Sequence, residues 1–458
     1  MANGDANRGT TVPSLLRRFG KIAMIAAYRS ARVVSHTAAS RIRPQNIDRA
    51  GSFPREFRLA LEDLGPTFVK FGQLLSTRSD LAPAQVQREL SKLQDHAPSI
   101  PHVELLAELK RSLKSNSSDL FASIEMSPIA CGSIAQVHRA TLHNGLRVAV
   151  KVRRPGVLAD VEADLWLVRK MARLIAWLSS RVRAYDPVAI LDEFAALLRA
   201  ETDFVTEASN IEAVRRTFAV TDAVTIPRVL TDMSGDSVLV MDWIEGVPLT
   251  DREGLEEAGA DRAVLARAIL QAYGVMIFQS DRFHADPHPG NLIAMKGNRL
   301  GLIDFGEVGS VEPAERSALL GMVTAVLGRD GEALAAAVLS VSRTTRSVDQ
   351  AEFGRQLAPL LDSVADASLK DLRLGETFGR LLRLLRRNGI VLPSDLAVLI
   401  KTLIECESTT LGLDPTMSML SLVGELGSIG PASGEVSVRP PSARRQRGRD
   451  PGPRRDDD

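Results

Sequence analysis

The chain has 458 residues, of which 45% are hydrophobic and 25% charged, so it can bury the core of an ordinary globular protein. Its 57 Lys and Arg residues and 56 Asp and Glu residues leave a net charge of +1, which gives no basis for expecting a nucleic-acid partner. Two cysteines, Cys131 and Cys406, exclude a disulfide framework and a zinc-type cysteine cluster, and favour a reducing cytosol.

The first part of the chain predicts an extension built from helices. Residues 1–12 are polar and predicted to be disordered, whereas residues 13–47 place Arg and Lys among Leu, Ile and Phe in a basic amphipathic pattern. Such a helix either lies on an anionic membrane or packs on the protein with a solvated basic face, and we favour packing. Residues 55–115 predict further helices, one of which starts after Gly65-Pro66.

Apolar runs in this sequence are too short to cross a bilayer. The nearest, residues 318–328, is followed by Arg329 and Asp330 and falls short of the roughly 18 residues that a span needs. The N-terminus also lacks the compact apolar core of a secretory signal. We therefore expect a cytoplasmic protein, with any membrane contact peripheral and at the inner face.

A β-rich part follows the predicted extension. Residues 134–142 and 147–152 alternate as strands do, and Asn144-Gly145 between them is a strong hairpin signal. The remaining predicted elements are, in chain order, a helical region over 157–220, strands over 226–232 and 237–241, a helix over 260–281, short strands over 292–294 and 300–303 about a turn at 296–298, and helices from 313 to 426.

This order of elements predicts the α+β, two-lobed fold of protein kinases, with a β-rich N-lobe and a helical C-lobe. Residues 428–458 are rich in Pro, Gly, Ser and Arg and are predicted to be disordered. The expected organisation is disorder over 1–12, a helical extension over 13–118, the N-lobe with its αC helix over 119–246, the C-lobe over 247–427 and a disordered tail over 428–458.

The clearest chemistry lies in residues 284–291 and in Asp304-Phe305-Gly306. Phosphoryl transfer needs a carboxylate that accepts the proton of the attacking hydroxyl, and oxygen ligands that hold a metal on the phosphates. Asn291 follows Asp286 by five positions, the spacing of the kinase catalytic loop. We therefore predict Asp286 as the catalytic base and Asn291 and Asp304 as ligands of Mg²⁺. A loop of Asp caps and turns is the alternative, which the combined spacing disfavours.

Two histidines, His284 and His288, flank Asp286. With no third His or Cys close in the sequence, structural hydrogen bonding is favoured over metal binding for both.

The predicted N-lobe supplies residues for the phosphates of ATP. Lys151 closes the predicted hairpin, and strand alternation turns it to the face opposite Val150, where it can neutralise phosphate oxygens. Small residues at 130, 132 and 135 let backbone amides approach phosphates. The phosphate-binding loop is predicted at Ile129, Ala130, Cys131, Gly132, Ser133, Ile134, Ala135, Gln136 and Val137.

A kinase lysine needs a glutamate from αC, and Glu207 is the predicted partner of Lys151, on one helix together with Glu201 and Asp203. A solvated acidic face is the alternative for this segment. The run 239–246 ends an apolar strand at a glycine-containing link, as a hinge between lobes does. We predict that backbone groups at Met241, Asp242 and Ile244 bind adenine.

With these residues in place, the chain resembles the UbiB/AarF (ADCK-type) family of atypical protein-kinase-like proteins, from about residue 55 to 310. The most specific element is Lys70-Phe71-Gly72-Gln73, which is similar to the KxGQ signature of that family and continues as Arg78-Ser79-Asp80-Leu81. Residues 201–203 look like its ExD motif, and residues 129–137 look like its alanine-rich loop. The family commonly has alanine at the position of Gly132. A glycine makes the loop more flexible and more like a conventional kinase loop, so we do not expect the loop to suppress phosphotransfer strongly.

The resemblance implies that the extension folds over the cleft where a protein substrate would dock, with Lys70, Gln73, Glu201 and Asp203 as gating residues. It implies an enzyme that uses ATP and Mg²⁺ for phosphotransfer to a small or lipid-like acceptor, or for ATP hydrolysis, in support of isoprenoid-quinone biosynthesis or lipid metabolism. Ala285 stands where ordinary kinases have arginine, so a phosphorylated activation loop would have no obvious partner. A helix is predicted to begin soon after Gly306, so we expect no long segment that could dock a peptide.

Two other functions remain open from the sequence. A nucleotide-binding scaffold would organise partner enzymes without turnover, although such a scaffold needs few of the metal and phosphate residues found here. A small-molecule kinase like the choline or aminoglycoside phosphotransferases would share the spacing of Asp286 and Asn291, but the signature at 70–73 disfavours it.

Overall fold

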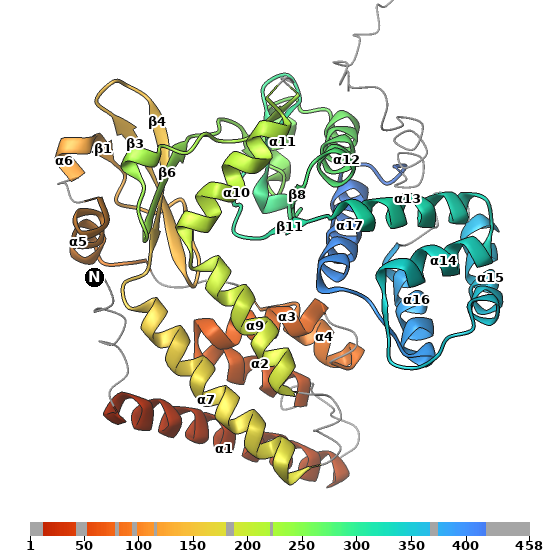
Figure 1. Ribbon diagram of the computed structural model, residues 1–458. Coiled ribbons are helices and arrows are strands. Elements are labelled where there is room, and N and C mark those ends of the chain that lie inside the picture. Colours follow the sequence, from red (N-terminus) through yellow and green to blue (C-terminus); the bar gives the residue numbers. More distant parts are fainter. Residues whose placement is uncertain are drawn as a thin grey trace, which may run out of the picture.

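A five-stranded antiparallel sheet lies at the upper left of the computed structural model as drawn in Figure 1. The structure describes residues 12–42, 53–77, 82–93, 99–113, 117–179, 187–219, 223–366 and 374–417. Residues 1–11, the signature continuation at 78–81 and the tail at 428–458 lie outside the described residues.

The strands of this sheet follow the order β1-β3-β4-β6, with β2 paired to β3. They are β1 (Phe121–Ile124), β2 (Ala130–Cys131), β3 (Ala135–Leu142), β4 (Arg147–Arg153) and β6 (Val238–Asp242). The predicted hairpin is confirmed, since Thr141 of β3 pairs with Arg147 of β4 and Gly145 turns the chain at a φ of 84°.

Alternation along β4 gives the sheet two different faces. Val148, Val150 and Val152 are fully buried and pack with Leu105 and Leu109 of α5 (His102–Leu113). Because successive side chains point to opposite faces, Lys151 is directed away from α5 and toward the rest of the molecule. The sequence predicted this orientation correctly.

The strand predicted over 226–232 is wrong. Only Val229 forms an isolated bridge, to Met241, and Thr231–Met233 is a 3-10 helix, η1. Pro227 has no amide hydrogen and so cannot donate to a strand ladder. The strand at this point is the short β5 (Val224–Thr225), which joins a different sheet.

That second sheet has the order β5-β10-β9-β7, from β7 (Val247–Pro248), β9 (Leu292–Met295), β10 (Arg299–Leu302) and β5. The predicted turn between β9 and β10 is confirmed, with Gly297 and Asn298 at φ of 77° and 58°. A further pair, β8 (Arg282–His284) and β11 (Val308–Ser310), flanks the segment that carries the candidate catalytic residues.

Helices form the lower and right-hand parts of Figure 1. The main core lies between α10 (Phe204–Thr217), α12 (Arg262–Gln279), α17 (Ser394–Leu413) and the second sheet, around buried residues such as Tyr273 and Phe305. The remaining elements, in chain order, are α6 (Ser117–Leu120), α7 (Val157–Leu178), α9 (Pro187–Glu201), α11 (Arg252–Glu257), η2 (Pro289–Asn291), α13 (Pro313–Leu327), α14 (Gly331–Val341), β12 (Arg343–Thr344), α15 (Gln350–Asp366), α16 (Leu374–Asn388) and β13 (Ile390–Val391).

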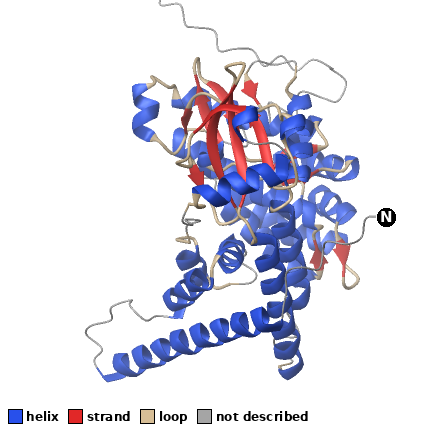
Figure 2. Ribbon diagram, turned by 90° about the vertical axis from the view of Figure 1, so that its left-hand side faces the viewer, coloured by secondary structure: helices blue, strands red, loops and turns tan. Residues whose placement is uncertain are grey.

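The range predicted as the N-terminal extension, residues 13–118, contains α1 (Val12–Ile42), α2 (Phe53–Leu64), α3 (Pro66–Thr77) and α4 (Ala84–Leu90), together with α5, which packs on the five-stranded sheet. The long α1 runs along the base of the molecule, on the side away from the strands (Figure 2). Ile22 and Ile25 of α1 are buried against the other helices, so α1 packs on the protein as favoured from the sequence. Among the described helices, none combines the length and the apolar character needed to cross a bilayer.

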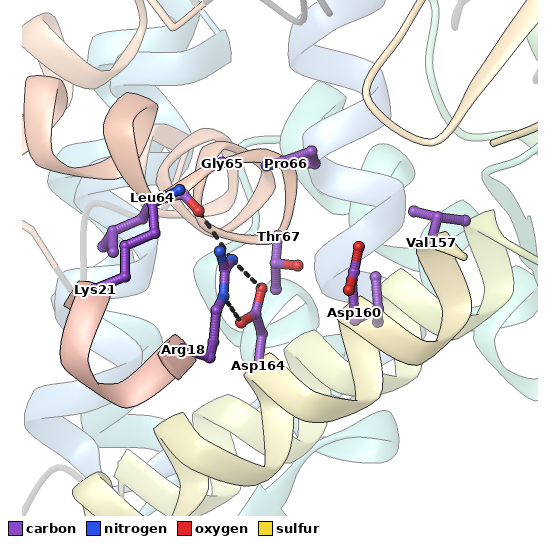
Figure 3. Close-up of a pocket in the computed structure, with 10 residues that line it drawn as sticks. Arg18, Lys21, Leu64, Gly65, Pro66, Thr67, Val157, Asp160 and Asp164 are labelled. Carbon is purple, nitrogen blue, oxygen red and sulfur yellow. Dashed lines mark hydrogen bonds and ion pairs between the residues drawn. The ribbon is translucent and has the colours of Figure 1, made fainter. Parts of the chain in front are cut away.

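An ion pair fixes α1 to α7 beside a cavity of about 170 Å³ (Figure 3). The Arg18 guanidinium donates to both Asp164 oxygens at 2.5 and 2.6 Å and to the Leu64 carbonyl at 2.9 Å. Asp164 is almost fully buried, so removing Arg18 would leave a buried charge without its partner.

Candidate active site

Lys151, Glu207 and Asp304 meet at the centre of the site, although they come from distant parts of the chain. The Lys151 Nζ lies 2.7 and 3.0 Å from the two Glu207 oxygens and 3.0 Å from Asp304 Oδ1. Glu207 comes from the first turn of α10 and is buried, whereas Asp304 follows β10 and is half exposed. The predicted contact between Lys151 and Glu207 is therefore present.

The charges at this centre are strongly coupled. Burial disfavours the ammonium of Lys151, but the carboxylates of Asp304 and Glu207 raise its pKa above the ordinary value. The positive charge of Lys151 lowers the pKa of Asp304 to about 2. Both groups therefore stay charged at neutral pH, and Asp304 is an ionised carboxylate that faces the solvent side of the site.

Asp304 also has an uncommon backbone conformation. Its φ of 59° lies in the left-handed region, which is costly for a residue other than glycine. The contact with Lys151 and the hydrogen bond from the Gly306 amide to Asp304 Oδ1, at 3.3 Å, hold the side chain in place. Strained residues of this kind concentrate at functional sites.

The second half of the site is the loop between β8 and β9. The Asn291 Nδ2 donates to Asp286 Oδ2 at 2.8 Å and to the Asp286 carbonyl at 3.3 Å. Because the amide NH₂ of Asn291 is used in this way, its side-chain oxygen is the atom left to meet a cation. The predicted spacing thus brings Asp286 and Asn291 into direct contact.

Both histidines of the loop serve its structure, as favoured from the sequence. His284 is buried, and its Nε2 lies 3.1 Å from the Ile303 carbonyl, which can only accept a hydrogen. The Nδ1 therefore accepts from the Asp286 amide, at 3.3 Å, and from the Tyr273 hydroxyl, at 3.2 Å. His288 Nδ1 accepts from the Gly290 amide at 3.1 Å.

The donor set fits a magnesium ion that carries phosphates. Asn291 and Asp304 offer hard oxygen ligands, and Mg²⁺ is usually held by one or two protein oxygens together with water and phosphate. Within the described part of the chain, no group of three or more His, Cys, Asp and Glu residues could enclose a metal by itself. A cation held by Asn291 and Asp304 would therefore complete its shell with oxygens of water or of bound phosphates.

Of the predicted gating residues, Lys70 and Glu201 form a direct contact. The Lys70 Nζ lies 2.6 Å from Glu201 Oε1, which joins α3 of the extension to the end of α9. A Cβ added at Gly306 would lie 4.0 Å from the Glu201 Cγ, so this ion pair is close to the Asp304-Phe305-Gly306 segment. Gly72 of the signature lets α3 pack closely on Leu93, because a Cβ at position 72 would come within 2.3 Å of the Leu93 side chain.

The other two gating residues bond elsewhere. Gln73 makes a long contact of 3.5 Å to the Leu93 carbonyl. Asp203 caps α10 by accepting from the amides of Val205 and Thr206. The acidic residues were predicted to share one helix, which is wrong: α9 ends at Glu201, and the Asp203 cap starts a new helix at Phe204.

The predicted phosphate loop is a tight hairpin of β2 and β3, with Ala130 opposite Val137 and Cys131 opposite Gln136. The Gly132 amide donates to the Ala135 carbonyl at 2.9 Å, and the Gly132 carbonyl accepts from Arg154 Nε at 2.8 Å. Ile134 at the turn is buried in a cluster with residues of α7 and α9. Gly132 is therefore held on both sides, which the sequence did not indicate because Arg154 belongs to no motif.

At the predicted hinge, Met241 pairs with Ala149 of β4, and Ile244 is buried. The Asp242 amide donates to the Arg228 carbonyl at 3.0 Å, so this amide is engaged within the protein. The assignment of Met241, Asp242 and Ile244 to adenine stays a prediction.

Lys401 and Glu405 of α17 were also missed. The Lys401 Nζ lies 3.0 and 2.9 Å from the Glu307 oxygens, and 4.0 Å from Glu405 Oε2. Burial of Glu405, together with the nearby carboxylates of Asp286 and Glu307, raises its pKa to about 7 against the attraction of Lys401. The sequence carries no signal for these contacts, because no motif or spacing relates α17 to the catalytic loop.

Glu405→Gln is expected to make the protein more stable at pH 8 but not at pH 4.5. The pKa of Glu405 is raised from 4.5 to about 7 on folding, so its ionised form destabilises the fold progressively as pH rises through that window. We expect a gain of about 1–3 kcal/mol in the free energy of unfolding at pH 8. Urea unfolding at both pH values measures it, and an equal effect at both would refute this origin.

Two known protein-domain families match this chain. The ABC1 atypical kinase-like domain matches residues 92–338, and the UbiB helical domain matches residues 357–418. Over 368 residues the chain is 35% identical to the Probable protein kinase UbiB of Marinobacter nauticus, covering 80% of this chain and 67% of that protein.

A solved structure shares the fold. Rv3197 from Mycobacterium tuberculosis, solved in complex with erythromycin, aligns with a TM-score of 0.54 and 25% sequence identity, and the match covers 81% of this chain and 95% of that one. The mixed helical and sheet architecture is thus that of a kinase-like protein.

Proposed function

The chain belongs to the UbiB family of ABC1 atypical kinase-like proteins, and on that premise we propose that it binds ATP with Mg²⁺ and transfers or hydrolyses the terminal phosphate. One observation carries this proposal: Lys151 contacts both Glu207 and Asp304, beside the joined pair of Asp286 and Asn291. These residue types meet the two needs of phosphoryl transfer, which are charge neutralisation and orientation of the attacking group.

Each residue has a defined task in this proposal. Lys151 neutralises phosphate oxygens, and Glu207 holds its ammonium in position. Asp286 orients the attacking hydroxyl or water and accepts its proton, while Asn291 fixes the Asp286 carboxylate through its NH₂ group. Asn291 and Asp304 would hold Mg²⁺, which supplies positive charge to the phosphates when bound.

Turnover of ATP by the purified full chain tests the proposal. We expect phosphate release, or transfer to an added acceptor, that depends on Mg²⁺ and is lost in Asp304→Asn. Equal turnover in the parent and in Asp304→Asn, or none in the parent, would contradict the enzymatic assignment and favour a nucleotide-binding scaffold.

We propose that the Lys70–Glu201 ion pair gates the site. It connects α3 to the neighbourhood of Gly306. The family resemblance implies that a protein substrate would otherwise dock over this cleft. This closeness of residues 66–77 to the site also disfavours the small-molecule kinase alternative.

Lys70→Ala is expected to speed amide hydrogen exchange in α3 and around residues 304–309. Both partners are partly exposed, so their loss is worth up to about 1 kcal/mol, which corresponds to up to about fivefold in exchange rate. Lys92→Ala, which removes the exposed contact with Glu89 on α4, is the control and should leave residues 304–309 unchanged. Equal exchange of these residues in both variants would contradict gating.

The acceptor proposed here is small or lipid-like, in isoprenoid-quinone biosynthesis or lipid metabolism. Within the described range 223–366, the short strand β11 and then α13 follow Gly306 directly, which leaves little chain for docking a peptide. The link to quinone or lipid metabolism comes from the resemblance of residues 55–310 to the UbiB/AarF family. Activity should rise with phenolic quinone precursors or anionic vesicles; an activity that neither affects would count against this acceptor class.

Peripheral contact with an anionic membrane is proposed for the face formed by α1 and α7. Trp177 and Leu178 of α7 are 72% and 68% exposed, and Met24 of α1 is 66% exposed. Burial of such side chains at an interface favours membrane association.

Trp177→Ser is expected to reduce co-sedimentation with anionic liposomes by about fivefold, equivalent to about 1 kcal/mol. Val103→Ser is the control, because Val103 is also an exposed apolar residue but lies on α5, outside α1 and α7. Unchanged binding in Trp177→Ser would place any membrane contact elsewhere.

A further inference from the structure

We propose that α17 is a working part of the active site, in which Thr409 and Thr402 are positioning residues that hold Asp286 from both sides. The inference rests on the proposed role of Asp286 as the base. α17 belongs to the region that matches the UbiB helical domain, whereas Asp286 belongs to the kinase-like region. The inference therefore gives the helical domain a role in the chemistry of the kinase-like region.

Two threonine hydroxyls of α17 reach the backbone next to Asp286. Thr409 Oγ1 donates to the Pro287 carbonyl at 2.8 Å, and Thr402 Oγ1 donates to the Ala285 carbonyl at 3.2 Å. Both threonines are buried, and a spacing of seven residues puts them on one face of the helix. The carbonyls that precede and follow Asp286 are thus both bound to the same rigid element.

Thr409 makes the more specific of the two contacts. Thr402 shares its hydroxyl hydrogen between the Ala285 carbonyl and the Val398 carbonyl of its own helix, the latter at 2.9 Å. Pro287 has no amide hydrogen, so its carbonyl is the backbone group through which residue 287 can be fixed. A hydroxyl donor at position 409 is therefore suited to setting the direction in which the Asp286 side chain leaves the loop.

A third contact joins α17 to the other half of the site. Lys401 contacts both oxygens of Glu307, which follows Asp304-Phe305-Gly306. The Glu307 carbonyl in turn accepts from the Ala285 amide at 2.9 Å. α17 thus binds the Asp286 segment and the Asp304 segment together, and so fixes the base relative to the proposed metal carboxylate. Small displacements between such groups are enough to reduce catalysis strongly.

The test compares Thr409→Val, Thr409→Ser and Thr410→Val in the full chain. Val keeps the volume but removes the hydroxyl, and Ser restores the hydroxyl. Thr410 is the matched control, because it is a buried threonine one position along whose hydroxyl donates only within α17, to the Cys406 and Glu407 carbonyls at 2.9 Å.

We expect Thr409→Val to lower the kcat of Mg²⁺-dependent ATP turnover by about tenfold with an unchanged KM for ATP. Thr409→Ser should recover the kcat to within about twofold of the parent, and Thr410→Val should match the parent. Lys401→Met, which acts through the Glu307 contact, should lower kcat by a similar factor. The inference is overturned if Thr409→Val and Thr410→Val have the same kcat, or if Ser does not rescue.

Hydrogen exchange of residues 284–291 gives a second readout that does not need turnover. It should be faster in Thr409→Val than in Thr410→Val, and equal rates would overturn the inference. A parent that does not turn over ATP would defeat the proposed function, whereas the exchange result would still decide whether α17 positions this loop.

Discussion

Asp286→Asn is expected to lower the turnover number with Mg²⁺-ATP by about 10²- to 10⁴-fold while ATP affinity stays within about twofold of the parent. The substitution removes the proton acceptor but keeps the size of the side chain. The amide oxygen of the new residue can still accept from Asn291 Nδ2, and the backbone contact with His284 is unaffected. The loss should therefore fall on chemistry rather than on binding.

Steady-state kinetics and calorimetric ATP titration measure the two quantities. Asp281→Asn is the control, because Asp281 is close in the sequence but its side chain is 93% exposed and its partner Arg316 lies 3.5 Å away. It should match the parent in both quantities. A turnover number in Asp286→Asn equal to that of Asp281→Asn would remove Asp286 from the proposed mechanism.

Lys151→Met is expected to weaken ATP binding by about 10- to 100-fold, the loss of a charge-assisted contact to phosphate. It should also destabilise the protein by about 2–4 kcal/mol, because the buried Glu207 loses the ammonium 2.7 Å away. The positive charge that holds the pKa of Asp304 at about 2 is removed as well, so the proposed metal carboxylate becomes easier to protonate.

A double variant separates the two effects. In Lys151→Met with Glu207→Leu, the buried carboxylate is gone, and most of the stability should return, since apolar residues often replace a buried pair without loss. ATP affinity should stay low. Recovery of affinity together with stability would show that Lys151 acts only through folding and would contradict its role at the phosphates. Arg199→Met, at the exposed pair with Glu162, should cost less than about 1 kcal/mol.

The predicted site residues that the structure brings into contact are mostly those whose signals are local. Asp286 and Asn291 lie in one loop, and their spacing determines that they meet. The hairpin that carries Lys151 could be predicted from the alternation of its strands and from Asn144-Gly145 at its turn. The partner Glu207 lies much further along the chain, and it could be predicted because the kinase fold supplies the expected neighbour.

What could not be predicted depends on tertiary packing or on competition between local preferences. The segment 226–232 has β-forming residues, but Pro227 removes a donor and the chain adopts a 3-10 turn instead. The Asp203 cap divides a segment that a helical pattern makes continuous. The contacts of Arg154 with the phosphate loop and of Thr409 with Pro287 join residues that no spacing rule relates.

We propose that this site binds ATP through a magnesium ion held by Asn291 and Asp304. Calorimetric titration of ATP into the purified full chain, with and without Mg²⁺, tests it most directly, with Asp304→Asn as the comparison. We predict saturable binding that Mg²⁺ strengthens by about tenfold or more in the parent, and no such strengthening in Asp304→Asn. No binding of ATP by the parent, or the same dependence on Mg²⁺ in both proteins, would contradict the claim.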